Sequence, residues 1–310
     1  MSQNQTALVA LDWGTSSLRA ARLDADGRVL EERSLPRGTL TIPPNGFASF
    51  FEANYAHWTG AIGTFCLISG MAGSKQGWKE APYCPCPAGF NEVAAALTWI
   101  EPRRIAIVPG LSCEHAHAPD VMRGEEVQIF GAMQLTGLRD GLFVLPGTHS
   151  KWAQVCDGRV TTFRTYMTGE FYALLSQHSI LAKTLPAEAE TPFDADAFAQ
   201  GVAMARTGTG LLHTAFSVRT LSLFSRMGAT ALPSYLSGLV IGEELRLQMP
   251  DVTLAGLDAA SEVVLIGSRT LTARYSQALA LQGVRSQSLG SEATWAGLHA
   301  LAGSLKTLFA

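Results

Sequence analysis

Two loops of the sequence combine glycine with hydroxyl-bearing residues, a composition suited to holding a chain of phosphates. Backbone N–H groups can converge on a phosphate where glycine leaves no side chain in the way, and hydroxyl groups add further donors. Each loop follows an apolar segment that is expected to be a strand, and the two together indicate more than either alone. The candidate phosphate-binding residues are Gly14, Thr15 and Ser16 in the first loop, and Gly147, Thr148, His149, Ser150 and Lys151 in the second.

Asp12 stands at the expected strand end just before the first loop. A carboxylate there could hold Mg²⁺ through water, because Mg²⁺ prefers oxygen ligands and keeps several of its own waters. The alternative is an ordinary aspartate that caps a turn. Asp12 is therefore the candidate metal-binding residue.

Three acids near the middle of the chain are candidates for proton transfer. Transfer of a phosphoryl group to an alcohol needs a carboxylate that accepts or orients the hydroxyl proton. The segment 119–127 carries Asp120, Glu125 and Glu126, with Arg123 among them. Glu125 and Glu126 fall at the expected start of a helix, where the helix dipole favours an acid. Because acids are common at helix starts, we expect one of the two only to cap the helix.

The nucleotide and nucleophile motifs of several other folds are missing from the sequence. It has no Gly-x4-Gly-Lys-Ser/Thr loop and no Gly-x-Gly-x-x-Gly after a strand, which disfavours a Walker-type ATPase and a Rossmann dehydrogenase. It also has no Gly-x-Ser-x-Gly elbow, which disfavours an α/β-hydrolase.

Composition excludes several classes of partner. The net charge of −3 gives no general attraction to nucleic acid or to an anionic membrane. No apolar run approaches the ~18 residues of a membrane span, and the first residues lack the layout of a signal peptide. Five cysteines, an odd number, suit reduced thiols better than a disulfide framework. We expect a cytoplasmic protein with a small-molecule substrate; a homo-oligomer stays open.

Two groups of residues resemble metal ligands only superficially. Cys84 and Cys86 have no second close cysteine pair beside them, whereas zinc needs about four ligands at characteristic spacing. Glu114, His115 and His117 lie in a segment that reads as a solvated polar loop. We expect no metal at either place.

The elements around the candidate residues follow the same pattern twice. Over 7–35 and again over 141–165, the sequence predicts a strand, a glycine turn, a second strand, an Asp-Gly turn and a third strand. The simplest architecture is a duplicated α/β domain with a cleft between the copies. We further expect helices near 47–62, 125–136, 169–181, 194–207, 211–227 and 232–248, strands near 64–69, 105–108, 262–266 and 284–288, and two closing helices.

With these residues in view, the sequence resembles the 2-dehydro-3-deoxygalactonokinases, kinases of bacterial galactonate catabolism, essentially from end to end. The blocks that carry the resemblance are LDWGTSSLRA (11–20), SGMAGSKQGWKEAPYCPCPAG (69–89), DVMRGEE (120–126), LPGTHSKWAQV (145–155), TYMTGEFYALL (165–175), LSGLVIGEEL (236–245) and VVLIGSRTL (263–271). The resemblance implies the fold of actin and hexokinase, with two ribonuclease-H-like domains, 1–137 and 138–310, around a central cleft.

The resemblance also implies roles for the candidate residues. ATP and Mg²⁺ would be used, with the two glycine loops on the ATP phosphates and the turn at Gly267 and Ser268 against the adenosine. Glu125 is the first candidate for the base, and Glu126 and Asp120 are the alternatives. The implied substrate is 2-dehydro-3-deoxy-D-galactonate, phosphorylated on its terminal (C6) hydroxyl.

The carboxylate of that substrate should require a cation or a cluster of N–H donors. The candidate substrate-binding residues are Ser74, Lys75, Gln76, Trp78 and Arg123. Simple solvation at the surface is the alternative for Lys75 and Lys79. Arg19 could reach a phosphate or serve a structural role.

Three other functions remain open from the sequence. One is a catalytically silent sensor of a sugar or nucleotide, and another is a phosphohydrolase that uses an acid at the same helix. The third is a kinase for a different sugar acid, because residue types do not fix the stereochemistry of the hydroxyl groups.

Overall fold

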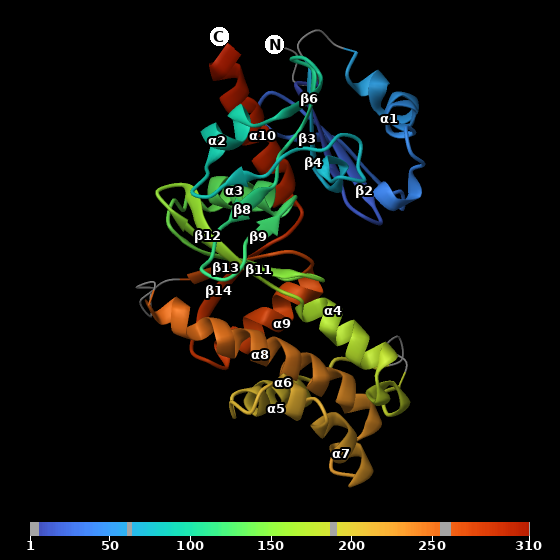
Figure 1. The fold of residues 1–310 in the computed structure, drawn as a ribbon, viewed down its shortest axis with the longest axis vertical. Helices are drawn as coiled ribbons and strands as arrows, with labels where there is room; N and C mark the ends of the chain where they lie inside the picture. Colours follow the sequence, from blue (N-terminus) through green and yellow to red (C-terminus); the bar gives the residue numbers. More distant parts are fainter. Residues whose placement is uncertain (1–5, 61–63, 187–190, 255–261, 310) are drawn as a thin grey trace. The chain divides into compact units, whose positions relative to one another are not determined.

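The computed structural model of the chain describes residues 6–60, 64–186, 191–254 and 262–309 (Figure 1). The chain divides into two compact units. The first unit comprises Met1–Asp140, Ala153–Phe163 and Leu289–Ala310, and the second comprises Gly141–Trp152 and Arg164–Ser288. The first unit thus includes the C-terminal segment of the chain. The expected domain boundary between 137 and 138 and the expected cleft remain predictions.

A six-stranded sheet forms the centre of the first unit. Its strands, in spatial order, are β3 (Val29–Leu35), β2 (Leu18–Leu23), β1 (Leu8–Trp13), β4 (Phe65–Gly70), β7 (Ile105–Ile107) and β6 (Thr98–Glu101). The first three strands form the antiparallel meander that the sequence predicts. β4 pairs parallel to β1, and β7 pairs parallel to β4. Parallel pairing brings the ends of β1 and β4 to one edge of the sheet.

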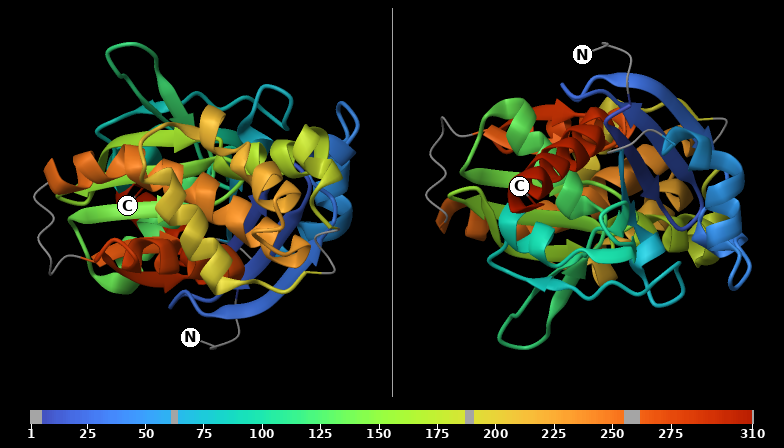
Figure 2. Two further views of the ribbon diagram at one scale, coloured as in Figure 1. Left: turned by 90° about the horizontal axis from the view of Figure 1, so that it is seen from below. Right: turned by 90° about the horizontal axis from the view of Figure 1, so that it is seen from above.

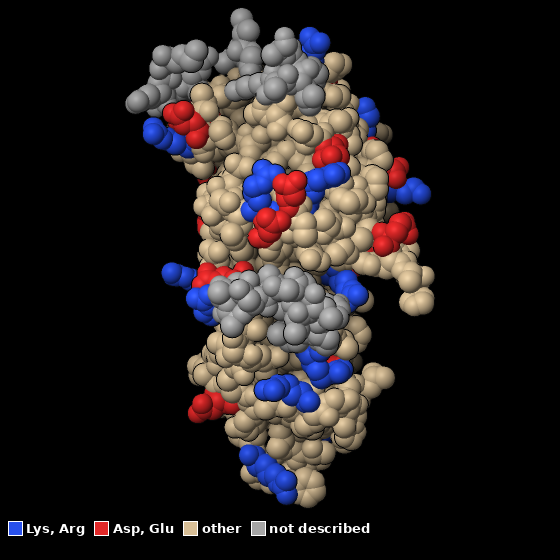
Figure 3. Space-filling view, turned by 90° about the vertical axis from the view of Figure 1, so that its left-hand side faces the viewer, with Lys and Arg blue, Asp and Glu red and all other residues tan. Residues whose placement is uncertain are grey.

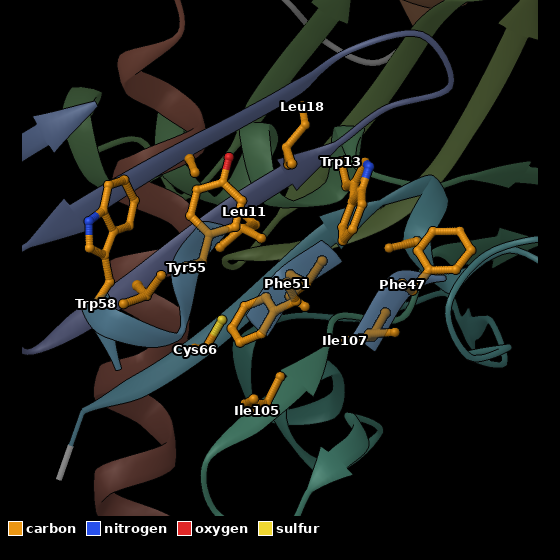
Figure 4. Packing of buried hydrophobic residues seen from close by; sticks show 14 of the residues in the cluster. Leu11, Trp13, Leu18, Phe47, Phe51, Tyr55, Trp58, Cys66, Ile105 and Ile107 are labelled. Carbon is orange, nitrogen blue, oxygen red and sulfur yellow. The ribbon is translucent and has the colours of Figure 1, made fainter. Parts of the chain in front are cut away.

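Helices cover both faces of this sheet. On one face, Phe51 and Tyr55 of α1 (Phe47–Tyr55) pack with Leu11 and Trp13 of β1 in a buried cluster (Figure 4). Because side chains alternate along a strand, Asp12 points to the opposite face. That face is covered by α3 (Glu125–Thr136) and α10 (Glu292–Phe309), which pack on each other (Figure 2). α1 is shorter than the expected helix over 47–62.

Two glycines allow α3 and α10 to approach each other closely. A Cβ on Gly131 of α3 would lie 1.7 Å from the carbonyl oxygen of Ala293, and one on Gly297 of α10 would lie 2.0 Å from that of Val127. These distances are far shorter than any van der Waals contact. The position of the C-terminal helix therefore depends on the absence of a side chain at both glycines.

A second, small sheet in the first unit was not expected from the sequence. β5 (Cys84–Pro85), β8 (Leu111–Cys113) and β9 (Asp120–Met122) form three strands in that order, and α2 (Phe90–Ala95) lies between β5 and β6 in the chain. Strands of two or three residues are too short to show a periodic pattern. All five cysteines are free, as the odd number suggested.

The second sheet repeats the strand order of the first. Its strands are β12 (Arg159–Tyr166), β11 (Ser150–Cys156), β10 (Gly141–Leu145), β13 (Glu262–Ile266) and β14 (Arg285–Leu289). As in the first sheet, three consecutive strands lie side by side, and the next strand pairs parallel to the first of them. The repeated order confirms the duplicated α/β architecture that the sequence predicts.

Helices make up most of the rest of the second unit, and several differ from expectation. The expected helix over 169–181 is a short α4 (Thr168–Ala173) followed by a π-helical turn, and that over 211–227 is split into α6 (Leu211–Thr214) and α7 (Ser217–Leu223). The others are α5 (Ala195–Ala205), α8 (Leu232–Leu254) and α9 (Arg269–Ala280). Among the described residues, no helix is both long and apolar enough to cross a membrane.

Candidate active site

The first glycine loop has its hydroxyl groups on the surface and its backbone fixed. Gly14 N donates to Ser17 O at 2.9 Å and closes the turn between β1 and β2. Thr15 and Ser16 are exposed. The chain after β3 packs directly against this turn. A Cβ on Gly38 would lie only 2.2 Å from the backbone of Thr15, so the two backbones are in close contact. The predicted phosphate loop thus presents hydroxyl groups on a supported backbone.

Asp12 is held by a cation from the neighbouring strand. Arg19 Nη2 lies 2.6 Å from Asp12 Oδ2, and the two residues are directly opposite each other in the β1–β2 ladder. The Arg19 guanidinium also lies 5.8 Å from the ring centre of Trp295 on α10. Arg19 therefore has structural partners both in the neighbouring strand, at Asp12, and in α10, at Trp295. Asp12 Oδ1 is the carboxylate oxygen that faces Gly70.

The ends of β1 and β4 meet the start of α3 at two glycines. Gly70 ends β4 with φ +87°, and a Cβ there would lie 2.8 Å from Trp13 O and 3.4 Å from Asp12 Oδ1. Gly124 precedes α3 with φ +103°, and its Cβ would lie 3.3 Å from Gly70 Cα. This approach brings the two acids that begin α3 next to the strand end that carries Asp12.

Glu126 is a wholly buried acid. Its Oε2 accepts a hydrogen bond from Gly124 N at 2.7 Å, whereas its Oε1 has no hydrogen-bond partner among the described residues. Burial raises the pKa of Glu126 to about 8, and the neighbouring Glu125 carboxylate adds to the shift. A carboxyl group with this pKa is mostly protonated at neutral pH.

Glu125 and Asp120 have different surroundings. Glu125 is half-buried, and its Oε2 accepts a hydrogen bond from Arg123 N at 3.0 Å. Asp120 belongs to β9 rather than to the helix start, and its Oδ1 accepts from Val121 N at 2.7 Å. Of the three predicted acids, Glu125 is the one that combines a place at the helix start with partial exposure.

Arg123 is largely enclosed. Its Nη2 donates to Ala81 O at 2.7 Å, and its guanidinium stacks on the ring of Tyr83 at 4.4 Å. Its Nε and Nη1 are buried and have no hydrogen-bond partner within the part of the chain that the structure describes. A Cβ on Gly73 would lie 2.7 Å from Nη1, so the loop 71–78 packs directly over the guanidinium.

The other predicted substrate residues lie on that loop, and they differ in exposure. Ser74 is half-buried, and Lys75 and Gln76 are exposed. Trp78 instead joins the core, with its ring 5.4 Å from that of Phe51. Among the predicted cations of this region, Lys75 is thus exposed, and Arg123 is half-buried with part of its guanidinium enclosed.

The second glycine loop covers 147–149, because the predicted loop residues Ser150 and Lys151 belong to β11, and it is supported by the start of α4. Glu170 N donates to Thr148 O at 3.1 Å, and Glu170 Oε2 lies 2.6 Å from His149 Nε2. A Cβ on Gly169 would lie 2.5 Å from Gly147 O, so the helix start touches the loop backbone. Thr148 and His149 are exposed.

Ser150 and Lys151, by contrast, are buried. The Ser150 hydroxyl donates to Glu244 Oε1 at 2.7 Å. Glu244, on α8, is a buried acid to which the sequence analysis gave no role. The signal that could have found it is a glutamate within the apolar run Leu236–Leu245.

The turn predicted to bind adenosine lies beside the second loop. β10 and β13 are parallel, so Pro146 and Gly267 follow neighbouring strands at the same edge. Gly267 has φ +156°, and a Cβ there would lie 3.4 Å from Pro146 O. Ser268 is the N-cap residue of α9, and its hydroxyl accepts from Leu271 N at 3.4 Å. The turn at Gly267 therefore lies at the same edge of the sheet as the start of the second glycine loop.

No cluster of three or more metal-ligating side chains occurs among the described residues. His115 Nε2 lies 2.8 Å from Phe163 O, so that ring has a backbone partner.

Mg²⁺ does not need a cluster of three protein ligands, since one or two carboxylates and substrate phosphates can hold it. Asp12 fits this mode, because its side chain is partly exposed and Arg19 holds Oδ2 rather than Oδ1. On the face drawn in Figure 3, the coloured Lys and Arg side chains form no continuous basic surface.

Comparison with known proteins gives full-length matches. A family model described as 2-keto-3-deoxy-galactonokinase matches residues 12–301. A probable 2-dehydro-3-deoxygalactonokinase of Rhizobium meliloti (strain 1021) is 39% identical over 298 residues, which cover 94% of this chain and 95% of that protein. The 2-dehydro-3-deoxygalactonokinase of Escherichia coli (strain K12) is 34% identical over 295 residues, covering 95% and 97%.

Solved structures agree on the fold. A crystal structure from Sinorhizobium meliloti, described as a candidate 2-dehydro-3-deoxygalactonokinase, matches with a TM-score of 0.85 and 36% identity, covering 97% of this chain and 99% of that one. A second match is the activator of the 2-hydroxyisocaproyl-CoA dehydratase from Clostridium difficile, solved with bound ADPNP. It has a TM-score of 0.50 at 10% identity, and the match covers 97% of each chain. At this identity the match shows the fold alone. The predicted α/β fold class is confirmed.

Proposed function

Because the chain belongs to the 2-keto-3-deoxy-galactonokinase family, we propose that it transfers a phosphoryl group from Mg-ATP to the terminal (C6) hydroxyl of 2-dehydro-3-deoxy-D-galactonate in the cytoplasm. The observation that carries the proposal is the meeting of Asp12, the first glycine loop and Glu125 at one edge of the first sheet. Phosphoryl transfer needs phosphate donors, a metal-holding acid and a base within reach of one another.

Glu125 is the proposed base. It sits where Gly124 and Gly70 bring the start of α3 against the end of β1, and its side chain is only half-buried, so a substrate hydroxyl can reach it. Its carboxylate would accept the hydroxyl proton as the bond to phosphorus forms. Glu126 is enclosed and mostly protonated, so in this proposal it caps the helix start through Gly124 N.

Asp12 is the proposed holder of Mg²⁺, through water, with Oδ1 toward Gly70. When bound, the ion neutralises charge on the transferring phosphoryl group. Arg19 holds Oδ2 and so keeps the carboxylate in one orientation. Thr15 and Ser16 add hydroxyl donors for the phosphates in the same place.

The second unit would hold the nucleotide. The backbone of 147–149 is proposed to bind phosphate, and the turn at Gly267 and Ser268 to face the adenosine. The sugar acid would then be recognised in the first unit, where the exposed Lys75 is the proposed partner of its carboxylate. The half-buried Arg123 is proposed to support the loop over it.

A coupled ADP-release assay across 2-keto-3-deoxy sugar acids and plain hexoses tests the proposal. We expect turnover with 2-dehydro-3-deoxy-D-galactonate and a loss of roughly 10²-fold or more in kcat for Glu125→Gln, the scale of general-base catalysis. Glu52→Gln, the same change on an exposed position of α1, is the matched control and should leave kcat unchanged.

Other outcomes would favour the rival functions. Release of free phosphate without any sugar acid would indicate a phosphohydrolase. Equal efficiency with glucose or galactose would contradict selection for a carboxylate. Nucleotide binding without any turnover across the sugar acids would indicate a sensor.

A further inference from the structure

The buried carboxylate of Glu244 is a hydrogen-bonding centre of the second unit. Its Oε1 accepts from Ser150 Oγ at 2.7 Å and from Trp152 Nε1 at 2.5 Å. Its Oε2 accepts from Tyr275 OH at 2.6 Å and from the hydroxyl of Thr168. Two donors on each oxygen match the lone pairs of an ionised carboxylate, which can accept all four. Burial raises the pKa of Glu244, whereas these four donors favour the ionised form and lower it.

Two of these donors are the residues that support the second glycine loop. Ser150 follows Thr148 and His149 and begins β11. Thr168 begins α4, and the next residue, Gly169, is the one that touches the backbone of Gly147. The Glu244 carboxylate therefore bonds both the strand residue that follows the loop and the start of the helix that supports the loop. Trp152 and Tyr275 fix that group from β11 and α9 (Figure 1).

We propose that Glu244 is a positioning residue for the nucleotide: through Ser150 and Thr168, it sets the backbone of 147–149 in the conformation that binds phosphate. The inference rests on the proposed function, because it takes this loop to be a phosphate site. Glu244 itself is buried, so in this proposal it acts through the loop and not by direct contact with the nucleotide. Its effect on affinity is indirect.

The sign of the effect separates positioning from simple electrostatics. A negative charge beneath a phosphate site repels the phosphates, so if charge alone mattered, removing it would strengthen nucleotide binding. If Glu244 positions the loop, Glu244→Gln weakens binding, because the amide keeps only one acceptor oxygen and turns an NH2 group toward the donors that bonded the other oxygen. Glu244→Gln keeps the shape of the side chain and distinguishes these two cases.

The test is the Kd of ADP, measured by calorimetry for the full-length chain. For Glu244→Gln we expect a Kd raised by roughly ten- to a hundredfold, the scale of lost hydrogen bonds to a charged group. The KM for the sugar acid should change little, because its proposed site is in the first unit. Glu243→Gln is the matched control: Glu243 is adjacent on α8 and pairs with Arg246 at 2.7 Å, and its loss should leave the Kd unchanged.

Substituting one residue that donates to Glu244 keeps the test informative if Glu244→Gln does not fold. Thr168→Val removes the hydroxyl without changing the shape and should raise the Kd of ADP several-fold, whereas Thr168→Ser should restore it. In the double variant Glu244→Gln with Thr168→Val, the loss of ADP binding free energy should be smaller than the sum of the two single losses, because both substitutions break the same contact. An unchanged or lowered Kd in the folded Glu244→Gln or Thr168→Val variant overturns the inference while leaving the kinase proposal intact. A wild-type chain that binds no nucleotide overturns both.

Discussion

Replacing Glu126 with glutamine should change how the stability of the first unit depends on pH. Glu126 is fully buried, only one of its oxygens is hydrogen-bonded among the described residues, and its pKa is raised to about 8. Glutamine has the shape of the protonated acid and does not titrate. Its oxygen can still accept the hydrogen bond from Gly124 N. The variant should therefore fold and lose only the pH-dependent part of the Glu126 contribution.

The sign and size follow from linkage. Between the ordinary pKa of 4.5 and the folded value of about 8, the folded protein keeps a proton that the unfolded chain has released. The contribution of Glu126 to stability is thus fully present below about pH 4.5, declines as the pH rises, and is lost above about pH 8. At about 1.36 kcal/mol per pKa unit, the decline between pH 5.5 and 8.5 is roughly 3 kcal/mol.

Native-state hydrogen exchange of the α3 amides measures this locally, which matters because two compact units need not unfold together. The opening free energy of α3 should fall with rising pH in the wild type by roughly 3 kcal/mol more than in Glu126→Gln. Glu52→Gln should follow the wild type. Parallel pH dependence in wild type and Glu126→Gln would refute the assignment of a raised pKa to this buried acid.

Two further predictions concern packing and substrate choice. Gly297→Ala would place a Cβ 2.0 Å from Val127 O and should cost about 2 kcal/mol or more. Gly303→Ala lies on the same helix, where an added Cβ meets no described atom within 4 Å, and it should stabilise by about 0.5–1 kcal/mol. Thermal unfolding of both variants checks this, and equal melting temperatures would contradict the α3–α10 contact. Lys75→Ala should lower kcat/KM for the sugar acid roughly tenfold or more and leave a neutral analogue unaffected; equal losses on both acceptors would count against a carboxylate partner.

The sequence by itself determined the elements and their local order. The alternation and short turns of 7–35 predicted the meander, and the structure has it. The helix expected over 125–136 has those bounds, and the repeat expected over 141–165 begins with the strand Gly141–Leu145. Such features follow from contacts between residues close in the chain, so turn residues and periodicity suffice to predict them. The resemblance to a kinase family was equally readable and is confirmed by the family match.

Only the tertiary structure decided the environment of each side chain. Glu125 and Glu126 are adjacent acids that no local rule separates, but roughly 100° of helix rotation leaves one half-exposed and buries the other. Ser150 reads as a loop hydroxyl, yet Glu244, 94 positions away, takes its hydrogen bond. Trp78 reads as a loop aromatic, yet it packs in the core against Phe51. Burial and partners at these positions depend on segments far apart in the chain, and only folding brings those segments together.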